Sequence, residues 1–248
     1  GAIDIFGLGN SGTNGAYVNV KIAYENIANM GTINIYANNV LKTSYTVAGL
    51  LNPSDASIRI GSAHHNHGEG LNATIKNISI SIGTNSSSSL TINSGSGAAN
   101  IVGNVGGVTT LTVNSDSNTS SMLGVMSGAG GLTLTAGTLT LSGTNTYTGA
   151  TTINGGTLNI TNNSGLGATT GTVRVSSGAT LDLQGVTVGA NPMTLAGGTL
   201  KDASSSFAGA ITLTADSTIS VTNATDAFTL SGVISGAGYG VTIGGSGT

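Results

Sequence analysis

The chain has 248 residues, a formal net charge of −3 at pH 7 and only 6% charged residues, far below the roughly 25% of an ordinary soluble domain. It has no cysteine, which excludes disulfides and thiolate metal sites, and no basic run, which argues against nucleic acid as a partner. No stretch approaches the ~18 consecutive apolar residues of a membrane-spanning helix, so none is expected. The 38% of hydrophobic residues, spread at regular intervals among 41 glycines, favour a repetitive β-structure over disorder.

The first part of the chain is expected to form antiparallel strands. In residues 16–24, AYVNVKIAY, aliphatic side chains alternate with tyrosine, asparagine and lysine, as expected for a half-buried strand. Residues 31–47, GTINIYANNVLKTSYTV, predict a hairpin, because the asparagines at 38 and 39 can adopt the positive φ of a tight turn. Residues 56–62, ASIRIGS, and 72–83, NATIKNISISIG, predict two further strands.

Three of these segments resemble the C-terminal half of a laminin-G/concanavalin-like jelly roll. INIYANNVL (33–41), IRIGS (58–62) and ATIKNISISI (73–82) match that pattern in order and spacing. The resemblance covers about a third of the chain and implies a partial antiparallel β-sandwich whose front half is missing.

Composition changes at GTNSSSSL, residues 83–90, which reads as a linker or turn. All three histidines and eight of the fifteen charged residues precede it. We therefore expect two regions, a jelly-roll-like one over residues 1–83 and a repetitive one over residues 84–248.

The second region repeats with a period of roughly twenty residues, which is typical of a solenoid. Each repeat has two short segments in which apolar residues lie two apart and so share one face of a strand. The leading segments are 131–135, 151–154, 172–175, 193–196 and 211–214, and the following ones are 138–141, 157–160, 180–183, 199–202 and 218–221. Segments 89–93 and 110–114 fit this scheme less cleanly. A coil of parallel strands is expected, with threonine outside and glycine or asparagine at the corners.

This register predicts an aliphatic core stacked from turn to turn. Its expected members are Leu139, Leu141, Ile153, Leu158, Ile160, Leu181, Leu183, Leu195, Leu200, Ile211 and Leu213.

Residues 130–160, GGLTLTAGTLTLSGTNTYTGATTINGGTLNI, resemble the autotransporter passenger-associated repeat. The run from Asn145 to Gly149, NTYTG, reproduces the centre of that pattern, and residues 230–248 resemble the stretch that usually precedes another copy. The resemblance implies an all-β fold, a right-handed parallel β-helix preceded by the partial antiparallel region, exported by a bacterium through type V secretion. Tyr147 is expected to pack on a corner or on the next turn rather than to bind a ligand.

The one dense group of possible ligands is HHNHGEG, residues 64–70, with His64, His65, His67 and Glu69. The last three alternate, so on a strand they would share a face, as metal ligands do. Histidine suits calcium poorly, and a polar loop between two strands is the plainer interpretation. A metal or glycan contact stays open as the alternative.

Four aspartates raise the alternative of a polysaccharide-active enzyme, which needs carboxylates converging at a groove. Asp182 and Asp202 lie about one period apart and would stack as like charges. Neither has a third acid, a histidine or a tryptophan platform near it in the sequence. We expect these two, with Asp216 and Asp226, to be solvated outward residues, and we expect no catalytic site, metal or cofactor.

Threonines that alternate with apolar residues, as in TLTL at 138–141, raise ice binding through a flat threonine ladder. The aligned strands carry Asn154, Arg174, Asp182 and Lys201 among their outward positions. An interrupted ladder is therefore expected.

The sequence predicts an extracellular bacterial structural or adhesive solenoid, a surface stalk or fibre-forming segment rather than an enzyme. A lectin-like module on a stalk, binding surface glycans, is the alternative. Because neither GAIDIFG (1–7) nor VTIGGSGT (241–248) carries a polar cap, we expect the ends to be covered by flanking parts of a longer chain or by other copies joined end to end.

Overall fold

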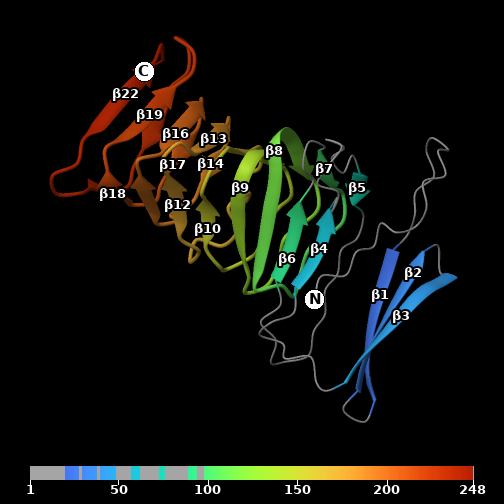
Figure 1. Cartoon of the computed structure of the whole chain (residues 1–248). Coiled ribbons are helices and arrows are strands. Elements are labelled where there is room, and N and C mark those ends of the chain that lie inside the picture. The colour runs from blue at the N-terminus through green and yellow to red at the C-terminus, as the bar shows by residue number, and fades with distance from the viewer. Residues whose placement is uncertain are drawn as a thin grey trace.

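The computed structural model describes residues 20–27, 30–37, 40–48, 57–61, 73–75, 89–93 and 98–247, and every regular element in these ranges is a strand. Most of them form an elongated parallel β-solenoid of about eight turns (Figure 1). Nowhere in the described ranges is there a helix long and apolar enough to cross a membrane.

Three strands form a separate antiparallel sheet: β1 (Val20–Ile27), β2 (Met30–Ala37) and β3 (Val40–Ala48). β2 pairs with both of its neighbours along the chain, and Ala37 faces Val40 across the connection from β2 to β3. The hairpin predicted over residues 31–47 is therefore confirmed.

The next two strands join the parallel sheet. β4 (Ser57–Gly61) pairs in parallel with β6 (Ser89–Asn93), and β5 (Ala73–Ile75) pairs in parallel with β7 (Ala99–Ile101). Sequence analysis placed both segments in an antiparallel region, and this pairing corrects that expectation. The physical reason is that alternation of apolar residues identifies a strand but not the direction of its partner. The division of the chain at residues 83 and 84 stays a prediction.

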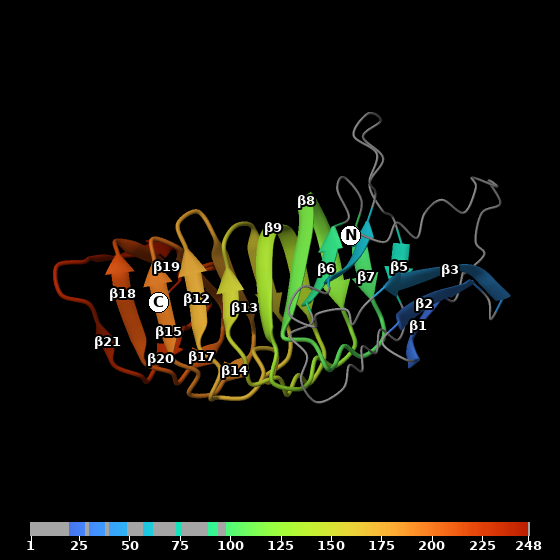
Figure 2. The ribbon, with the colours of Figure 1, turned by 60° about the horizontal axis from the view of Figure 1, so that its bottom comes forward.

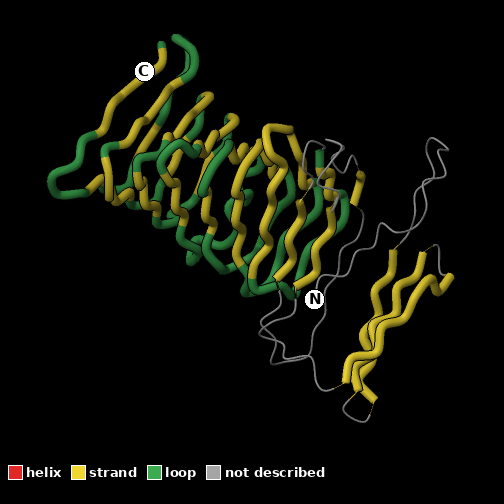
Figure 3. Tube along the Cα trace, viewed as in Figure 1, coloured by secondary structure: helices red, strands yellow, loops and turns green. Residues whose placement is uncertain are grey.

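The solenoid has two long stacks of parallel strands and a short third one. The first stack runs β4, β6, β8, β9, β10, β12, β15, β18, β21, the second runs β5, β7, β8, β9, β11, β13, β16, β19, β22, and the third runs β14, β17, β20. β8 (Thr110–Met122) and β9 (Gly131–Leu141) bend so that each contributes to both long stacks. Figure 2 shows the turns following one another along the rod, and Figure 3 shows strand and loop alternating within each turn.

The other strands of the first stack are β10 (Thr151–Ile153), β12 (Val173–Ser176), β15 (Met193–Ala196), β18 (Ile211–Ala215) and β21 (Ile234–Ser235). Those of the second are β11 (Thr157–Ile160), β13 (Thr180–Gln184), β16 (Thr199–Ala203), β19 (Ser217–Val221) and β22 (Val241–Gly245). The third stack consists of β14 (Thr187–Val188), β17 (Ser206–Phe207) and β20 (Thr229–Leu230).

The core is a set of aliphatic columns that run along the rod. Alternate residues of each strand point inward, and the register places Leu158 between Leu139 and Leu181. All eleven residues predicted for the core are buried, the most exposed being Leu213 at 5%. The predicted register is therefore confirmed.

Glycine shapes the corner that precedes β11 in the second stack. Gly156 lies just before β11 with φ +74°, where an L side chain is strained. A Cβ there would also overlap the carbonyl oxygen of Gly137, which occupies the same corner one turn earlier. The corner therefore requires glycine both for its conformation and for the close stacking of turns.

Replacing Leu158 with aspartate tests the register directly. The variant places a charge at a fully buried position between two leucines, and we expect it to lower the free energy of unfolding by several kcal/mol. Thermal and urea unfolding measure the change. Thr133→Asp, at a half-buried outward position, is the control and should change stability by less than about 0.5 kcal/mol. Equal melting temperatures for Leu158→Asp and the parent would contradict the register.

Candidate functional site

The NTYTG segment forms a buried polar clamp at a corner of the rod. Asn145 is only 2% exposed, although asparagine is a strongly polar side chain. Its Oδ1 accepts a hydrogen bond from the backbone N–H of Met126 at 2.8 Å, and its Nδ2 donates to the carbonyl oxygen of Gly165 at 2.8 Å. These partners lie 19 and 20 residues away, in the turn before and the turn after. One side chain therefore holds three successive turns together at a corner where strand pairing is interrupted.

Tyr147 fills the same corner from inside. Its side chain is fully buried, and its hydroxyl lies 2.6 Å from Oγ1 of Thr151. Thr151 occupies an inward position between Leu132 and Val173, where the column is otherwise aliphatic. The tyrosine hydroxyl gives this buried threonine its partner, so the two polar groups satisfy each other. The expectation that Tyr147 packs on a corner is confirmed.

Burial raises the pKa of Tyr147 to about 12, because the phenolate would lose its hydration, and the hydrogen bond with Thr151 lowers it in part. The phenol is therefore neutral at any physiological pH. It contributes packing and one hydrogen bond, and it supplies no acid–base chemistry.

Similar clamps recur at other corners, and sequence analysis missed them. Asn104 Oδ1 accepts from the backbone N–H of Val125 at 2.9 Å, and Asn191 Nδ2 donates to the carbonyl oxygen of Ala168 at 2.8 Å. Ser205 Oγ accepts from the N–H of Val186 and donates to the carbonyl oxygen of Leu183, each at 3.1 Å. The sequence signal for such a contact is an amide or hydroxyl side chain that lies about one repeat length from a corner. The high asparagine and serine content of the chain hides this signal.

The two aspartates considered as a catalytic pair do not converge. The register places Asp182 beside Lys201 and Leu183 beside Asp202. Neighbouring residues of a strand face opposite sides of the sheet, so Asp182 points outward and Asp202 points into the core. Both are buried, Asp182 at 4% and Asp202 at 0% exposure. Asp182 points outward as expected but is buried rather than solvated, and the expectation of a solvated outward residue is wrong for Asp202, which faces the core.

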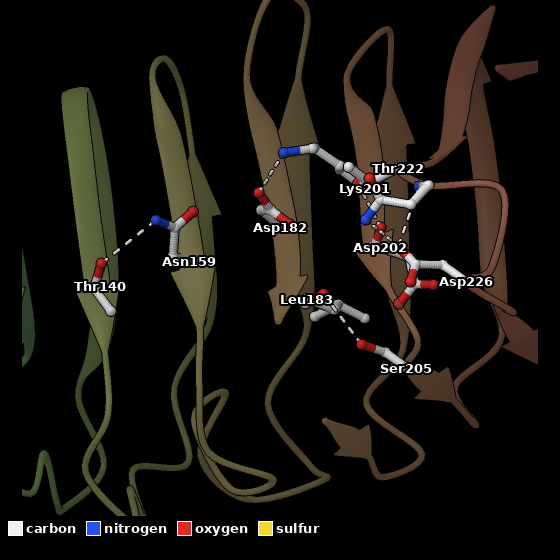
Figure 4. A network of polar contacts seen from close by, with 10 residues as sticks. Thr140, Asn159, Asp182, Leu183, Lys201, Asp202, Ser205, Thr222 and Asp226 are labelled. Atoms are coloured by element: carbon white, nitrogen blue, oxygen red, sulfur yellow. Dashed lines mark hydrogen bonds and ion pairs between the residues drawn. The ribbon is translucent and has the colours of Figure 1, made fainter. Parts of the chain in front are cut away.

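Asp182 belongs to an outward polar ladder with Thr140, Asn159 and Lys201 (Figure 4). Lys201 Nζ lies 2.9 Å from Asp182 Oδ2, while Asp182 Oδ1 and Asn159 Oδ1 are buried and have no hydrogen-bond partner among the described residues. Asn159 Nδ2 is 3.4 Å from the hydroxyl of Thr140. Rotating the Asn159 carboxamide by 180° would turn its oxygen to that hydroxyl and its N–H to Asp182, so that both acceptors gain a donor.

The remaining aspartates serve loops. Asp216 is exposed, as expected, and its Oδ1 accepts from the N–H of Gly240 at 2.7 Å. Asp226 is half-buried and accepts from the Ser204 hydroxyl at 3.0 Å and from Asn223 Nδ2 at 2.9 Å.

Across the described ranges no group of three or more histidine, aspartate or glutamate side chains could hold a metal ion. His64, His65, His67 and Glu69 lie outside these ranges, so both interpretations of them stay predictions.

A threonine column runs along the second stack from β8 to β22. It runs without interruption through Thr119, Thr138, Thr157, Thr180, Thr199, Thr218 and Thr242. The expectation of an interrupted ladder is therefore wrong for this column. The outward column beside it contains Asn159, Asp182 and Lys201, so the threonines form a single file rather than a two-column array.

Residues 136–160 match the family model described as Passenger-associated-transport-repeat. No curated protein and no solved structure matches the chain. The matched stretch contains the second half of β9, the NTYTG clamp, β10 and β11. The match and the parallel solenoid together fit an extracellular β-helix segment of an autotransporter passenger.

Titration of Tyr147 predicts a loss of stability at alkaline pH. In the unfolded chain the phenol ionises near pH 10, whereas in the folded chain it stays neutral until about pH 12. Its contribution is complete below pH 10 and is lost as the pH rises to about 12, with a total of about 3 kcal/mol for two units of pKa.

The measurement is the free energy of unfolding in urea at several pH values between 9 and 12. Tyr147→Phe is the matched variant, because it keeps the ring and cannot ionise. The other tyrosines titrate in both proteins, so the difference between the two curves isolates Tyr147. Parallel curves across this range would contradict the burial of the phenol.

Proposed function

We propose that this chain is an extracellular structural and adhesive β-solenoid, a stalk or fibre-forming segment of an autotransporter-type surface protein. The observation that carries the proposal is the continuous stacking of turns. Aliphatic columns and corner clamps run through the matched repeat and into the turns on both sides of it. An arrangement of this kind resists bending and extends a surface away from its anchor, because each turn adds about 4.8 Å of length.

An enzymatic role has little support in the described residues. Hydrolysis or elimination on a polysaccharide needs acids that face one groove. Asp182 is held by Lys201 on the outer face, and Asp202 faces the core from the neighbouring strand. The described surface also lacks the tryptophan platforms on which sugars stack, because the chain has no tryptophan at all.

Surface exposure on intact bacteria tests the proposal. An antibody raised against residues 98–247 should label intact cells that express the parent protein, and mild protease should remove the label. Labelling only after the cells are permeabilised would overturn an extracellular role. Binding of the purified chain to a glycan array separates the adhesive part of the proposal from a purely mechanical one.

The exposed apolar side chains of the last described turn support a proposal about the partners of this chain. Val233 and Ile243 are 73% and 69% exposed, although Ile243 continues the column that contains Ile219. Ile234 continues the column of Ile211 and is 42% exposed. A further turn stacked here would bury these side chains and pair the backbone groups of β21 and β22. We propose that flanking parts of a longer chain, or other copies joined end to end, provide that turn.

Association of the purified 248-residue chain tests this contact. In sedimentation velocity the chain should associate in the micromolar range, and the double variant Val233→Lys, Ile243→Lys should shift it towards monomer. Arg174→Lys, at an exposed position on the side of the rod, is the matched control and should behave as the parent does. A parent chain that stays monomeric at high concentration would count against end-to-end assembly.

A further inference from the structure

Asp202 occupies a position built for an aliphatic side chain. In the second stack one inward column passes through Leu141, Ile160, Leu183, Asp202 and Val221. The two strands beside β16 therefore place a leucine and a valine against this aspartate. It is the only charged member of that run.

The carboxylate of Asp202 has no partner within the described part of the chain. The residue is 0% exposed, and neither of its side-chain oxygen atoms has a hydrogen-bond donor. The adjacent Lys201 holds Asp182 on the opposite face of the sheet. The hydroxyl of Thr222 donates to the backbone carbonyl of Asp202, at 2.6 Å, and not to its side chain (Figure 4).

Other polar side chains near this corner are already engaged. Ser205 bridges Leu183 and Val186, and Asp226 accepts from Ser204 and Asn223. A buried carboxylate without a donor strongly disfavours the packed state. Asn145 and Thr151, the polar groups at the matched repeat, have their partners and carry no such penalty.

The unfavourable group sits where the rod has little to offset it. Each turn of a solenoid contacts only its neighbours, so a local penalty weakens the adjoining turns rather than the whole molecule. Within the described residues, Asp202 is followed by the turn with β18 and β19 and then by the last described turn, with β21 and β22. The exposed Val233 and Ile243 show that the last turn buries little apolar surface.

We infer that the rod has two ordered lengths and that Asp202 sets the point between them. In the long form all turns are stacked and Asp202 is buried. In the short form the C-terminal unit, β18 to β22 (Ile211–Gly245), detaches, and Asp202 becomes solvated on the new edge strand β16. A charge that points inward on an edge strand opposes pairing with another chain, so the short form has a protected end.

Native-state hydrogen exchange on the full chain tests the inference. Backbone amides of β19 and β22 should exchange through a common opening, with protection at least ten-fold lower than that of amides in β11 and β13. Asp202→Leu restores the aliphatic column and should raise protection in β19 at least ten-fold while leaving β11 unchanged. Asp202→Asn, which removes the charge and keeps the shape, should give a smaller increase in the same amides.

The variants at residue 202 distinguish the proposed detachment from ordinary fraying of a last turn, because fraying does not depend on residue 202. Ser220→Leu is the matched control, since it adds the same side chain to the outward face of β19. It should leave the exchange pattern unchanged. Equal amide protection in β19 and β13 of the parent chain would overturn the inference. So would unchanged protection in β19 in both variants, Asp202→Leu and Asp202→Asn.

Discussion

The stacking of one turn on the next is the constraint on which the rest of this molecule depends. Parallel strands at a spacing of about 4.8 Å pair every backbone group with the turns before and after. The same spacing fixes which side chains touch, since a residue in one turn contacts its registered partner in the next, as Leu158 contacts Leu139 and Leu181. Sequence repetition therefore matters only through register, and a substitution acts chiefly on neighbouring turns.

Corners are where this constraint is hardest to satisfy. The chain turns sharply there, strand pairing is interrupted and backbone groups need other partners. The structure meets this need with side chains that reach into the neighbouring turns, as Asn145 does from the centre of the NTYTG segment. Tyr147 adds bulk and gives Thr151 a partner. The matched repeat is therefore best understood as a device for joining turns, and this role accounts for its polar composition.

Much of the solenoid could be predicted from sequence because the signal has a short period and many copies. Alternating apolar residues located the strands, and their recurrence aligned the core. Two things could not be read this way. The direction of pairing of β4 and β5 depends on which strands lie beside them, and local alternation does not reveal this. The positions of buried asparagines depend on corner geometry, and asparagine is common throughout the chain.

The wrong prediction for Asp202 has a different cause, because the sequence contained the information needed to place this residue correctly. TLDL at 180–183 and TLKD at 199–202 align without a gap, and their aspartates stand at the third and the fourth position. One position along a strand is the difference between the outer face and the core. The prediction treated the period as approximate where the register needed it exact to the residue.

Whether a buried polar group has a hydrogen-bond partner distinguishes the stably stacked turns of this rod from the turns that we propose detach. Asn145 and Thr151 lie in the middle, with turns on both sides and all the hydrogen bonds given above, so their polarity adds specificity to the stacking. Asp202 is followed by two described turns, and among the described residues no hydrogen-bond donor reaches its carboxylate. A covering turn on β21 and β22 would bury more apolar surface beyond Asp202 and so oppose detachment of the C-terminal unit. Whatever stacks on the end of the rod is thereby coupled to the burial of a charge two turns away, through the ordinary contacts between neighbouring turns.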